Sequence, residues 1–451
     1  MLADRSFEES DRESDNAFEV RELGGIAESA RVLRADNGVP VSLKALVDSG
    51  ERPSVWSLDG RMAFVARPVD RIIPLGRTDV VRVRLASGRS IEIAGTAGLR
   101  TLDGWRRVRT LAVDDRIAIP RWIPETLQAT ELPDAEVILL AHMIGDGSCV
   151  KRQPIRYASI DEENLAAVTN AATHFGVTAV RDDYAAARVT TLRLPAPYHL
   201  THGRRNPIAA WLDELGLFGL RSYEKFVPAA IFTLPTEQVA LFLRHLWATD
   251  GSVRWDERGR QARIYYASTS LRLIEDVTVL LLRLGVHGRL KRVQKPGYRD
   301  CWHLVVDGGE NQTTFLEDVG VHGARGRSAE AALAQLDTMT TNTNVDTVPR
   351  EVWNRAQQLL PTRGMTHRQF QAAMGTKYCG SAMWKSSPSR LRLARAAEIL
   401  DAADLAMLCL DDIFWDRITE ITLLGEQVVF AASPDGSNGL VAQGIAVRTS
   451  L

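Results

Sequence analysis

The central part of the chain contains the same arrangement twice. Tyr-Ala-Ser at 157–159 returns at 266–268, and Gly-Val at 176–177 returns with the same spacing at 285–286. In each copy the hydrophobic pattern predicts an apolar helix, two strands, a second helix and two more strands. A duplicated αββαββ unit predicts two similar halves that pack about a pseudo-two-fold axis, as the subunits of a symmetric dimer do. We therefore expect a monomer with internal two-fold symmetry.

Each copy opens with an apolar helix that ends in Asp-Gly, LLAHMIGDG in the first and LRHLWATDG in the second. One Asp-Gly after an apolar helix is usually only a C-terminal turn, but its repetition on corresponding helices favours a function. Ala141 and Gly145 let a partner helix approach closely, which would bring Asp146 and Asp250 together. Carboxylates held close bind a cation or share a proton. The pair suits Mg²⁺ (or Mn²⁺) and metal-dependent chemistry on a phosphodiester.

Basic residues follow both motif helices and cluster in the strands of the second copy. A basic hairpin is often only a solvated face, but a two-stranded ribbon fits the major groove of DNA, where Arg reads guanine. Lys291 is also a candidate catalytic residue near the scissile phosphate, with phosphate contact or solvent exposure as the alternatives. The candidate DNA-binding residues are Lys151, Arg152, Arg156, Arg254, Arg260, Arg263, Arg289, Lys291, Arg292 and Lys295.

The two motif helices resemble those of the two-motif LAGLIDADG (DOD-type) homing endonucleases. The resemblance implies that the motif helices form a central interface and that sheets on either side form a saddle on double-stranded DNA. It also implies that Asp146 and Asp250 are catalytic metal ligands. His142, His245 and Thr249 depart from the motif. We interpret both histidines as helix-packing residues, with a direct role in the chemistry as the alternative.

The segments on either side of the repeat are rich in short strands, which predicts one β domain split by a large insertion. A helical segment after the repeat includes a pair with a helix-turn-helix pattern, which favours DNA contact about as much as simple packing. The predicted regions are a disordered acidic tail at 1–24, β structure at 25–125, the duplicated α+β region at 130–335 (copies at about 133–235 and 236–330), helices at 345–405 and β structure at 410–451.

The β segments resemble the Hint splicing domain of inteins in actinobacterial replicative DNA helicases (DnaB). Phrases such as VRLASGRSIEI, LRTLDGWRRVRTLAVDDRIAIPR and GLVAQGIAV carry the resemblance. The expected fold is therefore mixed: an all-β Hint domain split by an α+β endonuclease, with a small helical segment. The resemblance also implies that the DNA target is the host-gene site that lacks the intein.

The residues that perform splicing in such domains are absent from the matching positions. Splicing needs a Cys or Ser nucleophile, a Thr-x-x-His motif, and a His-Asn pair at the C-terminal end. All nine histidines lie between His142 and His367, so no shift of register supplies one to the β segments. We therefore predict a degenerate, splicing-incompetent domain. The matching positions are Gly25, Ala94, Ala97, Ala431, Asn438, Arg448, Thr449 and Ser450, of which only Ser450 keeps a nucleophile.

Composition excludes several other classes. Four cysteines without a CxxC pair predict neither a disulfide framework nor a zinc knuckle, and they fit a reducing cytoplasm. No apolar run is long enough to span a membrane, and no GxxxxGK[ST] motif is present for ATP hydrolysis. The net charge of −1 averages basic strands with acidic segments. The alternatives to an active endonuclease are a DNA-binding relic that has lost cleavage and an intein that still splices.

Overall fold

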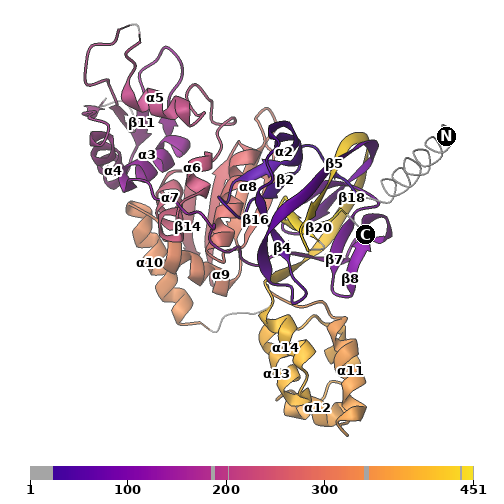
Figure 1. Ribbon diagram of the computed structural model, residues 1–451. Coiled ribbons are helices and arrows are strands. Elements are labelled where there is room, and N and C mark those ends of the chain that lie inside the picture. Colours follow the sequence, from indigo (N-terminus) through magenta and orange to yellow (C-terminus); the bar gives the residue numbers. More distant parts are fainter. Residues whose placement is uncertain (1–23, 184–187, 202, 340–344, 437–438, 450–451) are drawn as a thin grey trace, which may run out of the picture. The chain divides into compact units, whose positions relative to one another are not determined.

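The computed structural model describes residues 24–183, 188–201, 203–339, 345–436 and 439–449. The predicted tail at 1–24, apart from Gly24, lies outside this range. The chain divides into two compact units. The first comprises Met1–Asp36, Pro40–Pro120 and Asn344–Leu451, and the second comprises Asn37–Val39 and Arg121–Thr343 (Figure 1). No described helix is long and apolar enough to cross a membrane.

The first unit contains two antiparallel sheets, with strand orders β4-β5-β6-β1-β18-β9 and β3-β2-β19-β20-β7-β8. The long strands β5 and β18 also pair with each other, so the chain segments before and after the second unit form one structure. The elements are β1 (Ile26–Ala27), β2 (Arg31–Leu33), β3 (Pro40–Ser42), α2 (Leu43–Ser49), β4 (Ser54–Leu58), β5 (Phe64–Leu85), β6 (Ser90–Ala94), β7 (Gly98–Thr101), β8 (Gly104–Arg107), η1 (Val108–Thr110), β9 (Arg116–Pro120), β18 (Ile413–Pro434), β19 (Leu440–Ala442) and β20 (Ile445–Arg448).

Short helices belong to the same unit: α11 (Val352–Thr362), α12 (His367–Ala373), η3 (Gly380–Lys385), α13 (Arg390–Leu400) and α14 (Ala403–Leu410). A four-residue turn joins α11 to α12, and in it Gly364 takes the left-handed conformation with φ of 60°. Thr366 and Gln369 then form a capping box that starts α12. The guanidinium of Arg390 donates to Asp346, Asp411 and the carbonyl of Ile413, which fixes α13 to the start of β18.

The second unit has the same order of elements in both halves. The first half contains α3 (Asp134–Gly145), β10 (Gly147–Ser148), β11 (Arg156–Ser159), α4 (Glu162–Thr173), β12 (Val180–Asp182), β13 (Thr190–Arg193), α5 (Pro207–Glu214) and α6 (Ala229–Phe232). The second half contains α7 (Thr236–Asp250), β14 (Gly251–Asp256), β15 (Gln261–Ser268), α8 (Leu271–Arg283), β16 (Gly288–Val293), β17 (Cys301–Val306), α9 (Gly309–Thr314), η2 (Phe315–Val319) and α10 (Ala324–Asp337).

Each half builds one four-stranded antiparallel sheet, with orders β10-β11-β13-β12 and β14-β15-β17-β16. The alternation of buried and exposed residues along these strands explains the arrangement. In β15, for example, Ala262 and Ile264 are buried while Arg263 between them is exposed. One face of each sheet therefore packs against helices, and the other face is left to solvent. The fold is mixed α and β, as the sequence predicts.

Candidate active site

The helices α3 and α7 pack against each other with almost no space between their C-terminal turns. A Cβ atom added to Gly145 would lie 2.0 Å from Oγ1 of Thr249. Thr249 is buried, and its hydroxyl donates to the carbonyl of Leu246 at 2.6 Å, so it cannot turn away without losing that bond. The Thr that departs from the family motif thus fills the space left by Gly145, and the interface remains closed.

Both motif aspartates lie at the ends of these packed helices. Asp146 caps α3 and Asp250 is the last residue of α7, and each is followed by a glycine that begins the first strand of its sheet. Both side chains reach solvent, but the protein around them raises both pKa values. The pKa of Asp146 rises to about 6, chiefly through burial and then through the negative charge of Asp250. The structure therefore brings together the two carboxylates that the sequence pairs.

A buried lysine that the sequence analysis missed supports the end of α3. Lys225 is 5% exposed, and its Nζ donates to the carbonyls of Met143 at 2.8 Å, Ile144 at 2.9 Å and Gly147 at 2.8 Å. The last carbonyls of a helix have no partners within the helix, and a cation there satisfies them and complements the helix dipole. Burial lowers the pKa of Lys225, while the charges of Asp250 and Asp146 oppose that shift.

Arg325 does the same for α7. Its Nη1 donates to the carbonyls of Ala248 and Thr249, the latter at 2.5 Å. The positive charges of Arg325 and Lys225 both act to lower the pKa of Asp250, against the effect of its burial. Each motif helix thus has its own cationic cap, which comes from the end of its own repeat. The scarcity of lysine, seven residues against 48 arginines, was the signal that could have drawn attention to Lys225.

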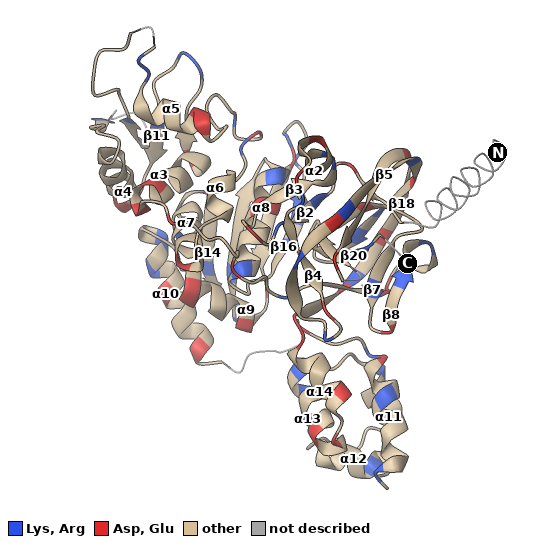
Figure 2. Cartoon of the chain, in the orientation of Figure 1, with Lys and Arg blue, Asp and Glu red and all other residues tan. Residues whose placement is uncertain are grey.

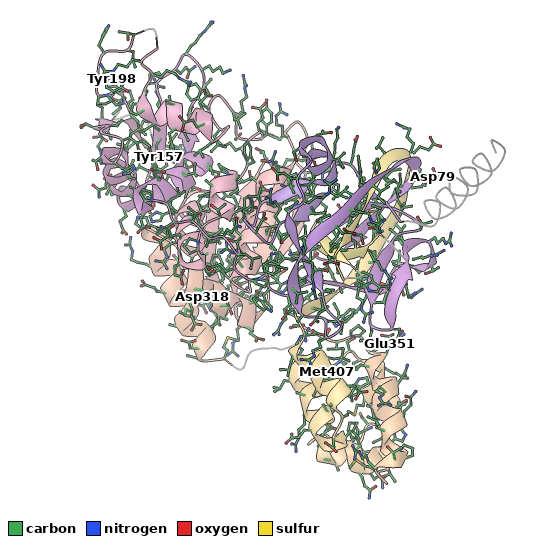
Figure 3. The ribbon with its side chains drawn as sticks, in the orientation of Figure 1. Asp79, Tyr157, Tyr198, Asp318, Glu351 and Met407 are labelled. Carbon is green, nitrogen blue, oxygen red and sulfur yellow. The ribbon has the colours of Figure 1, made fainter. Side chains whose placement is uncertain are left out.

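The two motif-helix histidines meet inside the interface. Nε2 of His142 lies 3.0 Å from Nδ1 of His245, and Nδ1 of His142 lies 3.0 Å from the hydroxyl of Tyr157 on β11. Figure 3 labels Tyr157 in the first repeat. The ring of His322 lies over His245 with 4.3 Å between centroids. Burial lowers the pKa of His142 to about 3 and that of His245 to about 2, so both rings are neutral near pH 7. They pack in the interface, as predicted, and they also form a polar network.

The protein ligands available for a metal are few. Among the described residues, no group of three or more His, Cys, Asp or Glu side chains could hold a metal ion. Two carboxylates at a solvent-facing end still fit Mg²⁺, because this cation keeps several waters and takes one or two carboxylates together with phosphate oxygens. The donor set fits a metal that binds together with a phosphodiester substrate rather than one held in a closed protein cage.

The predicted DNA-binding residues occupy two kinds of position. Those in the strands are exposed: Arg156 on β11, Arg254 on β14, Arg263 on β15, and Arg289, Lys291 and Arg292 on β16, the last ion-paired with Asp300. Those in the connections are Lys151 and Arg152 between β10 and β11, Arg260 between β14 and β15, and Lys295 between β16 and β17. Figure 2 shows that basic and acidic residues intermingle over the second unit.

Lys291 and Lys225 lie at different places relative to the motif aspartates. It pairs across the sheet with His303 and lies on β16, the strand of its sheet farthest from β14, which begins directly after Asp250. Its catalytic role stays a prediction. Lys225 contacts the backbone that carries Asp146, so it is the better candidate for a cation that acts at the motif.

The positions that match splicing residues lie together in the first unit. The backbone N–H of Gly24 donates to the carbonyl of Thr449 at 2.6 Å, and the N–H of Ala94 donates to the carbonyl of Gly25 at 2.8 Å. The hydroxyl of Thr449 is buried and bonds to the backbone of Ala432, donating at 2.6 Å and accepting at 3.0 Å. The remaining matching positions are Ala97 and Ala431, both buried, and Arg448 on β20; Asn438 and Ser450 lie outside the described residues.

A side chain at Gly25 would contact Val429 too closely unless the valine moved. A Cβ atom there would lie 2.5 Å from Cγ2 of Val429, the strand residue packed over it. The junction therefore holds both ends of the β unit in place by backbone hydrogen bonds. Among the described residues at this junction, none of the matching positions carries a thiol, an imidazole or a carboxamide.

Comparison with known proteins matches residues 237–320, from α7 through η2, to the LAGLIDADG-like domain family. The chain is also 34% identical over 446 residues to the replicative DNA helicase DnaB of Synechocystis sp., covering 96% of this chain and 50% of that protein. It is 38% identical over 440 residues to DnaB of Rhodothermus marinus, covering 96% and 46%. The chain thus spans about half the length of the curated relatives it matches.

Two classes of solved structure show partial likeness. A DnaB intein from Synechocystis sp. is 29% identical with a TM-score of 0.21, covering 22% of this chain and 70% of that one. The homing endonuclease I-DmoI in complex with DNA and Mn is 15% identical with a TM-score of 0.28, covering 41% and 96%.

Proposed function

We propose that the chain is an intein of the DnaB type in which the second unit is a site-specific, divalent-metal-dependent endonuclease for double-stranded DNA, and in which splicing activity is lost. One observation carries the nuclease proposal. Asp146 and Asp250 end two closely packed helices of a duplicated unit, and the negative charge of Asp250 raises the pKa of Asp146. Such a pair attracts a cation. The actinobacterial character of the host gene stays a prediction.

Asp146 and Asp250 would hold Mg²⁺ or Mn²⁺. The cation, when bound, supplies positive charge that stabilises the phosphodiester as negative charge builds up on its oxygens. The protein contributes orientation. Lys225 binds the last carbonyls of α3 and Arg325 binds those of α7, so each cation fixes the turn from which one aspartate projects. These cations also oppose the rise in pKa that burial causes at both aspartates, which favours the ionised form that binds metal.

The solvent-facing sides of the two sheets would contact DNA. Their strands expose basic side chains opposite the core, and a monomer with two similar sheets suits a target that spans two half-sites. The helical segment at 345–405 would add contacts through the α11–α12 pair, which has the short glycine-containing turn typical of helix-turn-helix motifs.

The loss of splicing follows from the chemistry of the junction. Acyl transfer cannot start without a nucleophile at Gly25, and Thr449 has no carboxamide to cyclise. The steric contact of Gly25 with Val429 adds a second obstacle, since replacing this glycine by cysteine alone would also require Val429 to move. Mass spectrometry of the expressed chain tests this proposal. We expect a single intact mass, and a fragment released at Gly25 or Thr449 would contradict it.

Cleavage of a plasmid that carries an uninterrupted DnaB gene site tests the nuclease proposal. We expect linear product in Mg²⁺ and none in EDTA. Asp146→Asn and Asp250→Asn should each abolish double-strand cleavage, while Asp337→Asn, at the far end of α10, serves as the matched control. Binding without cleavage by the unchanged protein would favour the decayed relic instead. Equal cleavage by Asp250→Asn would overturn the assignment of the site.

A further inference from the structure

Three arginines on the solvent-facing sides of the two sheets of the second unit share one arrangement. In each, Nε and Nη2 both donate to a neighbouring aspartate. Arg193 contacts Asp182 at 2.6 and 3.0 Å. Arg263 contacts Asp256 at 3.1 and 2.9 Å. Arg289 contacts Asp307 at 2.7 and 2.6 Å.

The aspartate holds the guanidinium by its side edge and leaves its terminal edge open. A guanidinium has five N–H donors in a fixed plane, so two bonds to one carboxylate set the orientation of that plane. The terminal Nη1 and Nη2 hydrogens then point away from the aspartate. The three arginine side chains are 43%, 46% and 47% exposed, so this terminal edge is accessible to a ligand.

Other arginine–carboxylate pairs of the sheets lack the open edge. Arg181 on β12 donates through Nε to Asp183 and through both Nη atoms to Glu162, at 2.6 and 2.7 Å. Its donors are therefore occupied on both edges. Arg292 donates to Asp300 through its terminal Nη2. The arrangement of Arg193, Arg263 and Arg289 is thus specific to these three among the described arginines of the two sheets.

The three pairs lie on the faces proposed to meet DNA. Arg193 follows buried Leu192, and Arg289 precedes Leu290, which is 9% exposed. Strand alternation therefore directs both arginines away from the core. Asp182 and Asp256 lie on the same sheet faces as their arginine partners. Asp182 lies two residues beyond Val180, which pairs with Arg193. Asp256 lies two residues beyond Arg254, which pairs with Arg263.

We propose that Arg193, Arg263 and Arg289 each read a guanine in the major groove, donating from the terminal edge to O6 and N7. A phosphate contact suits these pairs poorly, because the adjacent aspartate would repel it. A G·C pair suits them well, because the aspartate can accept from N4 of cytosine at the same or a neighbouring pair. The target then contains one such guanine in the half-site under the first sheet and two under the second. This inference rests on the proposed DNA-binding function.

Selection of bound DNA from a duplex library tests the inference. The full chain is incubated in EDTA with duplexes that carry about 20 randomised base pairs, roughly two turns of B-DNA. Bound molecules are then sequenced. The unchanged protein should select a sequence with fixed guanines. Arg263→Lys keeps the charge but loses the planar fork, and Asp256→Asn removes the negative charge that holds the fork in place. Both variants should lose preference at the same single guanine, by between about 5- and 100-fold.

Two further variants complete the design. Arg193→Lys should relax a different guanine in the other half-site, whereas Arg181→Lys, with its donors already occupied, should leave every preference unchanged. Selection of a sequence that Arg263→Lys and Arg193→Lys leave unaltered would overturn the inference and leave the proposed function standing. Selection of no sequence at all by the unchanged protein would overturn both. Loss of overall affinity without a change at any one base would show phosphate contacts instead.

Discussion

Acidification should destabilise the second unit through the buried histidine pair between α3 and α7. An unfolded histidine has a pKa of about 6.5. In the folded protein, burial lowers the pKa to about 3 for His142 and about 2 for His245. Between these pKa values, the two imidazoles therefore bind protons in the unfolded chain but not in the folded chain. The stability that the neutral rings permit is complete above pH 6.5, and it is lost progressively as the pH falls toward 3.

The size of the effect follows from the gap between the two states. A pH of 5 lies about 1.5 units below the pKa of the unfolded imidazole. Each buried ring therefore lowers the free energy of unfolding by about 2 kcal/mol at this pH, and the pair by about 4 kcal/mol. His142 is fully buried and His245 is 5% exposed, so solvent does little to reduce this cost. Asp146 acts in the opposite direction, because its raised pKa lets the folded state take up a proton as the pH falls.

A comparison of variants separates these effects. Hydrogen exchange of peptides from α3 and α7 would be followed by mass spectrometry at pH 5 and pH 7.5, after correction for the intrinsic exchange rate. We expect the opening free energy of the unchanged chain to be lower at pH 5. His142→Gln keeps hydrogen-bonding atoms near Tyr157 but does not titrate, so about half of the histidine contribution should disappear. His367→Gln, on exposed α12, is the control. An equal pH dependence in the unchanged chain and in His142→Gln would refute the reasoning.

Three further predictions concern the motif helices. Gly145→Ala should lower the free energy of unfolding by about 1–3 kcal/mol through overpacking, as measured by urea denaturation. Adding Thr249→Gly should recover part of this lost stability. An unchanged stability of Gly145→Ala would show that the helices can separate freely. Cleavage should decrease below about pH 6 as Asp146 becomes protonated, and in a pH series of cleavage rates a flat profile down to pH 5 would contradict this. Lys225→Met should abolish cleavage and lower the free energy of unfolding by about 1–3 kcal/mol, because it leaves the carbonyls at the end of α3 without hydrogen bonds. Unchanged cleavage by this variant would show that Lys225 does not act at the site.

The repeated sequence motifs were enough to predict the order of helices and strands in the second unit. Strand alternation and the apolar motif helices are local patterns, and the duplication turned one ambiguous Asp-Gly into a pair. The predicted loss of splicing also rests on the sequence alone, because a side chain that is absent from the sequence cannot be supplied by folding. Gly25, Ala94 and Thr449 carry no thiol, imidazole or carboxamide wherever the chain places them.

Lys225, Arg325 and the histidine pair could not be predicted in their roles. Lys225 reaches the carbonyls of Met143 and Ile144, about 80 positions earlier in the chain, and no periodicity links residues so far apart. The same holds for His142 and His245, which are contributed by different repeats and become neighbours only when α3 and α7 pack. Their neutral state depends on burial, which is a property of the packed interface.

The sequence by itself therefore determined the repeated order of elements, the pair of aspartates and the prediction that splicing is lost, because these depend on residue identity and local period. Only the tertiary structure decided which cations support the aspartates, which histidines are neutral and which arginines keep an open edge. Those properties depend on distances and solvent exposure between segments far apart in the chain. The exposed sheet faces show the difference most clearly: the sequence identified Arg263 and Arg289 as basic, and the fold placed an aspartate against one edge of each guanidinium.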